Sequence, residues 1–235
     1  MIMDKLEQIA DQVRQTFDTQ TAARDKALTQ ARALTRHCSL AIRAVHREDT
    51  DAMQTNLDEA GKLADSLTTD LEQFPNLYHT GYTQDALKEY AEAHITCALI
   101  RNQPLPAPDE IHVIHATYLK GLSEVVGELR RRCLDILRSG YSADAERLLT
   151  SMDDIFAVLV TMDYPDAITN GLRRQTDIAR SIIERTRGDL TFSQRGEHLT
   201  RAIAGLSQQL NSSELLPGDL SMNTYKTDEE DASDN

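Results

Sequence analysis

Apolar residues recur at helical spacing along almost the whole chain. On one predicted helix the inner side carries Leu28, Ala31, Leu34, Cys38, Ala41, Ile42 and Val45. The interruptions coincide with turn signals, such as the alternating prolines of "NQPLPAPDE", which favour an extended connection. The pattern predicts helices over residues 4–17, 21–47, 51–72, 85–100, 109–139, 142–162, 165–188 and 193–210. We therefore expect an all-α, single-domain bundle of about seven helices.

The local signals at the helix ends support this division. Asp109 and Ser142 are the expected N-caps of two helices, and Gly140 is the expected stop between them. Pro165 suits the first turn of the helix that follows. From residue 211 onward the chain is polar and acidic, so we expect a helical domain over 1–210 and a disordered tail over 211–235.

Composition narrows the class of protein. A chain of 235 residues with 40% hydrophobic residues is long enough for one domain with a true core. Trp is absent and Gly and Pro are sparse, which argues against a β-sandwich and a Gly-rich nucleotide-binding fold. No leader segment or long apolar run occurs, so we expect a cytoplasmic protein with no membrane association. Cys38, Cys97 and Cys133 lack CxxC spacing and are predicted to be reduced, packed thiols.

The charge balance is unusual in its choice of cation. The net charge is −13, with six Lys against nineteen Arg. An acidic surface poor in lysine suits solubility in high salt, where self-repulsion is screened, and predicts a halophilic source. Five acidic residues follow Thr227, which leaves about −8 for the rest of the chain. Overall acidity argues against nucleic-acid binding, although a local basic site stays compatible with it.

Carboxylates lie on an otherwise apolar helix in the stretch "DALKEYAEAHITCALI", residues 85–100. At about 100° per residue, one stripe contains Asp85, Glu89, Glu92 and Thr96. Most of the remaining circumference is apolar, which indicates a helix packed on most sides. Because carboxylates are costly to desolvate, the ordinary interpretation of this stripe is a narrow strip that faces solvent.

The following helix shows a similar arrangement. Its stripe contains Gly121, Glu124, Glu128, Arg131 and Asp135. The opposite side is apolar, so a solvated face is again the default interpretation. Gly121 and Gly127 lie on or beside the carboxylate face, and a mid-helix glycine costs about 1 kcal/mol and usually permits a close approach.

Four carboxylates would converge if the two stripes faced each other: Glu89, Glu92, Glu124 and Glu128. Oxygen clusters of this kind bind hard divalent cations such as Mg²⁺ or Mn²⁺. The natural chemistry would be metal-assisted phosphodiester cleavage, with the cation activating water and neutralising developing charge. Spacing alone does not show that the stripes converge.

Three segments, "YLKGLSEVVGEL", "SGYSADAERLLTSMDDIFAVL" and "LRRQTDIARSIIERTRGDL", resemble in order and spacing the C-terminal half of the translin superfamily. That superfamily comprises translin and translin-associated factor X. A long helix ending in "AVHR" and the segment "EYAEA" extend the likeness over residues 24–196. The resemblance implies an all-α bundle of about seven helices that assembles into hollow rings or barrels, commonly octamers. It also implies binding of single-stranded RNA, and possibly DNA, by a homo-oligomer.

With its four carboxylates, the chain resembles the translin-associated factor X branch more than translin itself. Within that branch it resembles archaeal members. Members of that branch are metal-dependent endoribonucleases, and their catalytic carboxylates lie on two adjacent helices. By resemblance, its ExxE pair falls on Glu89 and Glu92, while an Asp and a Glu of its second helix align with Glu124 and Glu128. This implies an endoribonuclease that uses Mg²⁺ or Mn²⁺ bound by all four glutamates. Glu124 departs from the family pattern, because Glu is one methylene longer than Asp.

Arginines provide the candidate nucleic-acid surface. One face of the helix over 21–47 carries Arg32, Arg36, Ser39, Arg43 and Arg47, with His46 alongside. Guanidinium groups at this spacing can follow phosphates, and a solvated face on an arginine-rich protein explains the same pattern. Arg131 points to the carboxylate side, where it could hold a scissile phosphate or neutralise Glu128 and Asp135.

Two alternatives to the nuclease stay open. One is a non-catalytic nucleic-acid-binding ring, in which the longer side chain of Glu124 spoils the metal geometry. The other is a helical assembly scaffold without a nucleic-acid role, which the overall acidity favours.

Overall fold

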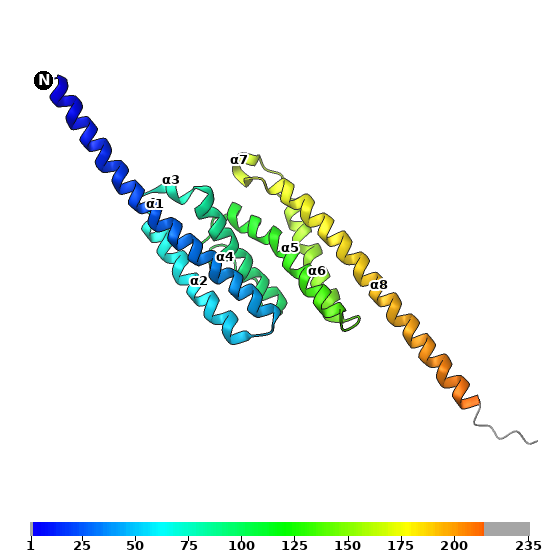
Figure 1. Cartoon of the computed structure of the whole chain (residues 1–235). Helices are drawn as coiled ribbons and strands as arrows, with labels where there is room; N and C mark the ends of the chain where they lie inside the picture. Colours follow the sequence, from blue (N-terminus) through cyan, green and yellow to red (C-terminus); the bar gives the residue numbers. More distant parts are fainter. Residues whose placement is uncertain (1, 214–235) are drawn as a thin grey trace, which may run out of the picture. The chain divides into compact units, whose positions relative to one another are not determined.

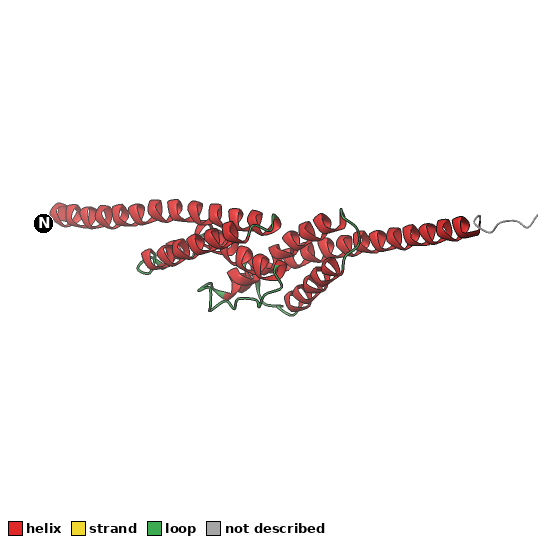
Figure 2. Cartoon of the chain, turned by 90° about the horizontal axis from the view of Figure 1, so that it is seen from below, coloured by secondary structure: helices red, strands yellow, loops and turns green. Residues whose placement is uncertain are grey.

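Within residues 2–213, the part that the computed structural model describes, all regular secondary structure is helical (Figures 1 and 2). The elements are α1 (Ile2–His46), α2 (Thr50–Asp70), α3 (Pro75–Tyr78), α4 (Gly81–Ile100), α5 (His115–Leu137), α6 (Ala143–Val160), α7 (Asp166–Thr169) and α8 (Leu172–Ser213). The chain divides into two units, Met1–Gln194 and Arg195–Asn235. The all-α prediction is confirmed, with two of the eight described helices being single turns.

The first unit is built around α4. This helix packs against α1 on one side and against α5 on another, while α1 also packs along α2 and α5 along α6. The first half of α8 adds Leu172, Ala179, Ile183 and Leu190 to the same hydrophobic core. Because α4 has neighbours on several sides, most of its residues are buried, including polar Thr83, Gln84, Glu92 and Thr96.

Two predicted helix breaks are absent from the described residues. Residues 4–17 and 21–47 form the single helix α1, and the predicted helix end near Gly188 lies inside α8. The segment between Phe17 and Thr21 has only residues of moderate helix propensity, and each costs less than about 0.7 kcal/mol. Gly188 costs about 1 kcal/mol, which the long helix tolerates.

The start of α5 was also predicted wrongly. Asp109 lies in the connection after α4, and α5 begins at His115 without a side-chain cap. Between Asp109 and His115, His112 adopts the left-handed conformation with φ of 53°, and a right-handed helix cannot continue through it, so α5 starts later than the polar signal at Asp109 suggested. Gly140, with φ of +116°, does end the segment after α5, and the Ser142 side chain accepts a bond from the Asp144 N–H at the start of α6.

Pro165 begins a shorter element than expected. It is the N-cap of the one-turn helix α7, which ends at Asn170 in the left-handed conformation with φ of 52°. Gly171 follows with φ of +86°, and α8 starts directly after it. Two consecutive residues in this conformation separate α7 from α8, because a right-handed helix cannot continue through them.

The described part of the second unit is the remainder of α8, from Arg195 to Ser213. Its apolar side chains Leu199, Ile203, Leu206 and Leu210 are exposed. Residues 214–235, which hold most of the predicted acidic tail, lie outside the described residues. None of the helices in 2–213 combines the length and the apolar character that a membrane span requires.

Gly121 sets the distance between α4 and α5. A Cβ atom at this position would lie 2.9 Å from the Lys88 carbonyl oxygen and 3.1 Å from the Glu92 backbone nitrogen. Only glycine therefore allows the two backbones to approach so closely. At Gly127, on the same helix, an added Cβ would meet nothing within 4 Å.

We predict that Gly121→Ala destabilises the protein by about 1–3 kcal/mol, because the clash is with backbone atoms that cannot turn away. Gly127→Ala is the matched control and should be neutral or stabilising by up to about 1 kcal/mol, since alanine is the better helix former. Urea unfolding followed by circular dichroism measures both changes. Equal stability of the two variants would show that the spacing of α4 and α5 does not depend on Gly121.

Candidate metal centre

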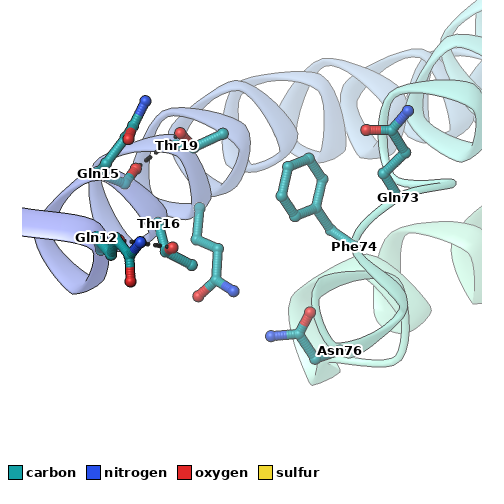
Figure 3. Close-up of a pocket in the computed structure, with 8 residues that line it drawn as sticks. Gln12, Gln15, Thr16, Thr19, Gln73, Phe74 and Asn76 are labelled. Carbon is teal, nitrogen blue, oxygen red and sulfur yellow. Dashed lines mark hydrogen bonds between the residues drawn. The ribbon is translucent and has the colours of Figure 1, made fainter. Parts of the chain in front are cut away.

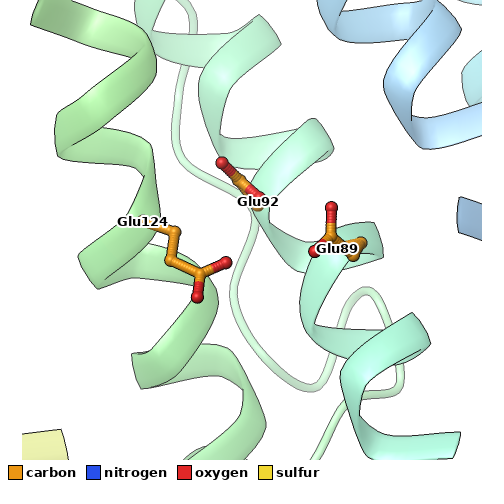
Figure 4. Close-up of side chains that lie close together, drawn as sticks. All are labelled: Glu89, Glu92 and Glu124. Atoms are coloured by element: carbon orange, nitrogen blue, oxygen red, sulfur yellow. The ribbon is translucent and has the colours of Figure 1, made fainter. Parts of the chain in front are cut away.

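Three carboxylates meet between α4 and α5. Glu89 and Glu92 project from neighbouring turns of α4, and Glu124 comes from the facing helix α5 (Figure 4). One oxygen from each side chain can be chosen so that all three atoms lie within 4.8 Å of one another. The helical i, i+3 spacing of the first pair and the close approach at Gly121 together create this cluster.

The cluster is buried at one end and open at the other. Glu92 is only 8% exposed, and within residues 2–210 its carboxylate makes no hydrogen bond or ion pair. The side chains of Glu89 and Glu124 are 29% and 31% exposed. Burial first, and then the charges of Glu89, Glu124 and Glu128, raise the pKa of Glu92 to about 8. A buried carboxylate without a partner favours either a proton or a cation beside it.

A lysine lies against the cluster. Lys88 Nζ is 2.6 Å from Glu124 Oε2 and 3.2 Å from Glu89 Oε1. Burial lowers the pKa of Lys88, but its contacts with Glu124 and Glu89 outweigh burial, so that the net direction is upward. The other oxygen of Glu124 accepts a hydrogen bond from Gln175 Nε2 at 3.3 Å, and Ser123 donates to Gln175 Oε1 at 2.8 Å. Glu124 is thus held from both α4 and α8.

Glu128 lies one turn beyond Glu124 and has different partners. Its Oε2 is 2.6 Å from His46 Nε2 and 3.5 Å from Arg131 Nη1. The hydrogen bond from His46 is the main reason why the pKa of Glu128 is lowered, which keeps this carboxylate ionised. His46 Nδ1 is buried without a hydrogen-bond partner in the part of the chain that the structure describes. The three-carboxylate cluster therefore excludes Glu128, although its charge acts on Glu92.

The donor set suits a hard divalent cation. All three ligand atoms are carboxylate oxygens, which Mg²⁺ and Mn²⁺ prefer, and the burial of Glu92 makes a cation beside it favourable. The three cysteines are unsuitable alternatives, because each is buried and burial raises the pKa of its thiol. The cluster could therefore hold a metal, and the histidines at positions 112 and 115 lie outside it.

The predicted arginine stripe is exposed along α1 and at Arg47, which directly follows that helix. Arg32, Arg36, Arg43 and Arg47 make no ion pair within the described residues. Arg32 shares a surface pocket of about 390 Å³ with Asp85 and Glu89 of α4. One end of the arginine stripe therefore lies beside the carboxylate cluster.

The consecutive arginines of α5 have separate roles. Arg130 bonds to Asp189 and Thr186 of α8, and Arg132 bonds to Glu48. Arg131 is half exposed, and Glu128 is its ion-pair partner at 3.5 Å among the residues described. Of the three side chains, Arg131 is the one with room to contact a ligand.

A second cavity, of about 620 Å³, lies where α1 passes the α2–α3 connection (Figure 3). Its lining is made of amides, hydroxyls and one ring: Gln12, Gln15, Thr16, Thr19, Gln20, Gln73, Phe74 and Asn76. No charged side chain lines this cavity, so it lacks the carboxylates of a metal site and the cations that make a strong phosphate site. The carboxylate cluster remains the candidate site.

Comparisons with known proteins agree with this fold. The chain is 34% identical over 194 residues to the uncharacterised protein MJ0175 of Methanocaldococcus jannaschii, an alignment that covers 80% of this chain and 86% of the relative. The solved structure of AfC3PO with duplex RNA is 29% identical, with a TM-score of 0.74 over 79% of this chain and 96% of that one. C3PO is the complex of translin and translin-associated factor X. The chain belongs to the translin family.

Another solved structure shows how widely the translin fold is shared. Apo-NeC3PO is 20% identical, with a TM-score of 0.72 over 78% of this chain and 96% of that one, and this likeness concerns the fold alone. No family model matches the chain. The family resemblance stated from the sequence is therefore confirmed by a relative and by solved structures.

Sequence reasoning about this translin-family protein missed Lys88, Gln175 and the contact of His46 with Glu128. Lys88 directly precedes Glu89, and helix neighbours at i, i+1 do not usually face each other, so the spacing gave no signal for the contact. Gln175 and His46 lie about fifty and eighty residues from their partners. No local pattern could have placed either one at the site.

We predict that Glu92→Gln removes a pH-dependent loss of stability from the metal-free protein. The pKa of Glu92 is about 8 in the folded chain, against an ordinary value of 4.5, so the unfolded state ionises first as the pH rises. Wild type should therefore lose stability between about pH 4.5 and pH 8, and the glutamine variant should lose less. Urea unfolding in chelator at about pH 5 and pH 8.5 measures this difference. Asp85→Asn, at an exposed carboxylate of the same stripe, is the control, and equal pH profiles for all three proteins would contradict the prediction.

Proposed function

We propose that this protein is an endoribonuclease that cleaves single-stranded RNA with a divalent metal, Mg²⁺ or Mn²⁺. The observation that carries the proposal is the convergence of Glu89, Glu92 and Glu124 within 4.8 Å in a chain that belongs to the translin family. A metal bound there supplies activation of water and neutralisation of the charge that develops on the scissile phosphate.

The residues of the site divide the remaining tasks. Glu89, Glu92 and Glu124 bind the metal, and burial of Glu92 excludes water from one side. Glu128, kept ionised by His46, increases the negative potential that attracts a cation to the cluster. Arg131 lies on the exposed side of Glu128, where its guanidinium can hold a phosphate oxygen.

RNA reaches the site along α1. AfC3PO has been solved with duplex RNA, which makes RNA the ligand to expect in a family member of 29% identity. Arg32, Arg36 and Arg43 of α1, and Arg47 directly after it, make no ion pair within the described residues, and Arg32 borders the pocket that Glu89 lines. Phosphates that follow this stripe would be led toward the carboxylates.

Assembly is part of the proposal. The helical domain over 1–210 would form a homo-oligomeric ring that encloses the RNA. By resemblance to the translin superfamily, this ring would be an octamer. The exposed apolar side chains on the first turns of α1, among them Leu6, Ile9 and Val13, support the existence of further contacts between copies. The acidic, lysine-poor composition supports a halophilic source as part of the same proposal.

The main alternative is a ring that binds nucleic acid without cutting it. The longer side chain of Glu124 was the reason for this alternative, yet its carboxylate does reach the cluster and is held by Lys88 and Gln175. This geometry favours the nuclease over the binding ring. A helical scaffold without nucleic acid is disfavoured by the exposed arginine stripe, whose member Arg32 lies beside the carboxylate Glu89 and makes no ion pair within the described residues.

The first test of function is cleavage of a labelled single-stranded RNA in Mg²⁺, Mn²⁺ or chelator, with duplex RNA in parallel. The double variant Glu89→Gln/Glu92→Gln should lose on the order of a thousandfold in cleavage rate while keeping its oligomer size, because it removes two metal ligands.

Glu124→Asp is predicted to lower the cleavage rate, since the shorter side chain draws its carboxylate away from Lys88 and Gln175. Binding without cleavage in every metal would leave the non-catalytic ring, and faster cleavage by Glu124→Asp would show that the longer arm is the defect.

The second test concerns the arginine stripe. Arg32→Ala/Arg36→Ala should weaken RNA binding by about tenfold at moderate salt and reduce the salt dependence, because phosphate contacts release counterions. The matched control is Arg180→Ala, which removes an arginine already paired with Glu184 on α8. Fluorescence anisotropy with a labelled RNA at several salt concentrations measures both variants. Equal affinity of the two would exclude α1 as the binding face.

A further inference from the structure

Lys88 occupies the space that a divalent ion would need. Its Nζ is 2.6 Å from Glu124 Oε2 and 3.2 Å from Glu89 Oε1, so its ammonium group joins α4 to α5 through two of the three candidate metal ligands. The Lys88 side chain is only 13% exposed, so neighbouring residues cover most of it. No other lysine or arginine contacts Glu89, Glu92 or Glu124 in the described chain.

A metal ion and this ammonium group exclude each other. Mg²⁺ and Mn²⁺ bind carboxylate oxygens at about 2.0–2.2 Å. Since the three ligand atoms lie within 4.8 Å of one another, an ion that contacts both Glu89 and Glu124 must lie between them, close to where Nζ now lies. Repulsion between a divalent cation and an ammonium group at that separation is large in a partly buried site.

The cluster also needs a cation when no metal is present. Three carboxylates within 4.8 Å repel one another, and among the described residues Glu92 makes no hydrogen bond or ion pair. Lys88 offsets this repulsion, and its four-carbon stem is flexible enough to carry the ammonium group away when something else takes over the role. A fixed arginine fork at this position would not release the site so readily.

We propose that Lys88 is the resident counter-cation of the carboxylate cluster, which holds Glu89 and Glu124 together in the metal-free protein and is displaced when a divalent ion binds. Lys88 is thereby a positioning residue that sets the metal affinity of the site. The inference rests on the proposed metal-dependent function. It adds a competition between the protein's own cation and the metal.

The decisive experiment compares Mn²⁺ binding by wild type, Lys88→Met and Lys120→Met, by titration calorimetry. Methionine keeps most of the stem and removes the charge. Lys120 is the matched control, because it lies on α5 and its carboxylate partner is Asp85, at 3.9 Å, outside the cluster. We expect Lys88→Met to bind Mn²⁺ on the order of tenfold more tightly than wild type, and Lys120→Met to change affinity by less than about twofold.

Stability in chelator is the second measurement. In chelator, Lys88→Met should unfold at a lower urea concentration than wild type and Lys120→Met, because it leaves the carboxylates without a cation. Added Mn²⁺ should restore the stability of Lys88→Met and so remove this difference. Weaker Mn²⁺ binding by Lys88→Met, or affinity equal to that of Lys120→Met, would overturn the inference while metal-dependent cleavage by wild type still stood. Absence of Mn²⁺ binding in both wild type and Lys88→Met would overturn the metal site itself.

Discussion

The close approach of α4 and α5 is the constraint on which the site depends. At Gly121 the backbone of α5 lies against the carbonyl oxygen of Lys88 and the N–H of Glu92, so the turn of α4 that carries the carboxylates is the turn in contact. A side chain at that point would hold the helices apart and draw Glu124 away from Glu89 and Glu92. Gly121 therefore sets both the spacing of α4 and α5 and the convergence of the three carboxylates.

Burying α4 creates the electrostatic problem that the site must solve. With α1, α5 and core residues around it, the helix has little surface left for charge, yet it carries Glu89 and Glu92. Even the Cys38 thiol of α1 is affected, because burial first, and then these two carboxylates, raises its pKa. Proteins retain such unfavourable groups mainly where function requires them, since an apolar residue would stabilise the core. The cost of Glu92 thus argues for a cation-binding role independently of family membership.

Sequence patterns predicted the fold well and the site in part. Helical spacing gave the core face of α1 and placed Glu89 and Glu92 on one stripe and Gly121 and Glu124 on another. Spacing did not show that the two stripes face each other, which the structure does for Glu89, Glu92 and Glu124. The ordinary interpretation of the stripe on α4 as a solvent strip holds only at Asp85, because exposure falls steadily toward Glu92. Sequence patterns could not supply contacts between residues far apart in the chain, such as Gln175 with Glu124. They also did not show that α1 and α8 are continuous, because residues of low helix propensity such as Gly188 were taken as helix ends.

The extra methylene at Glu124 can be understood only together with its surroundings. A longer arm misplaces a carboxylate when the backbone around it is fixed and nothing holds the arm. Here one oxygen contacts Lys88 and the other accepts from Gln175, which itself is fixed by Ser123. The added length is taken up by partners on α4 and α8, so the rotamer is selected by contacts on both sides. An Asp at this position would need a different pair of partners, because the shorter arm draws its oxygens back toward α5. The contacts that hold the Glu124 carboxylate in the cluster thus come from residues outside the acidic stripes, Lys88 and Gln175.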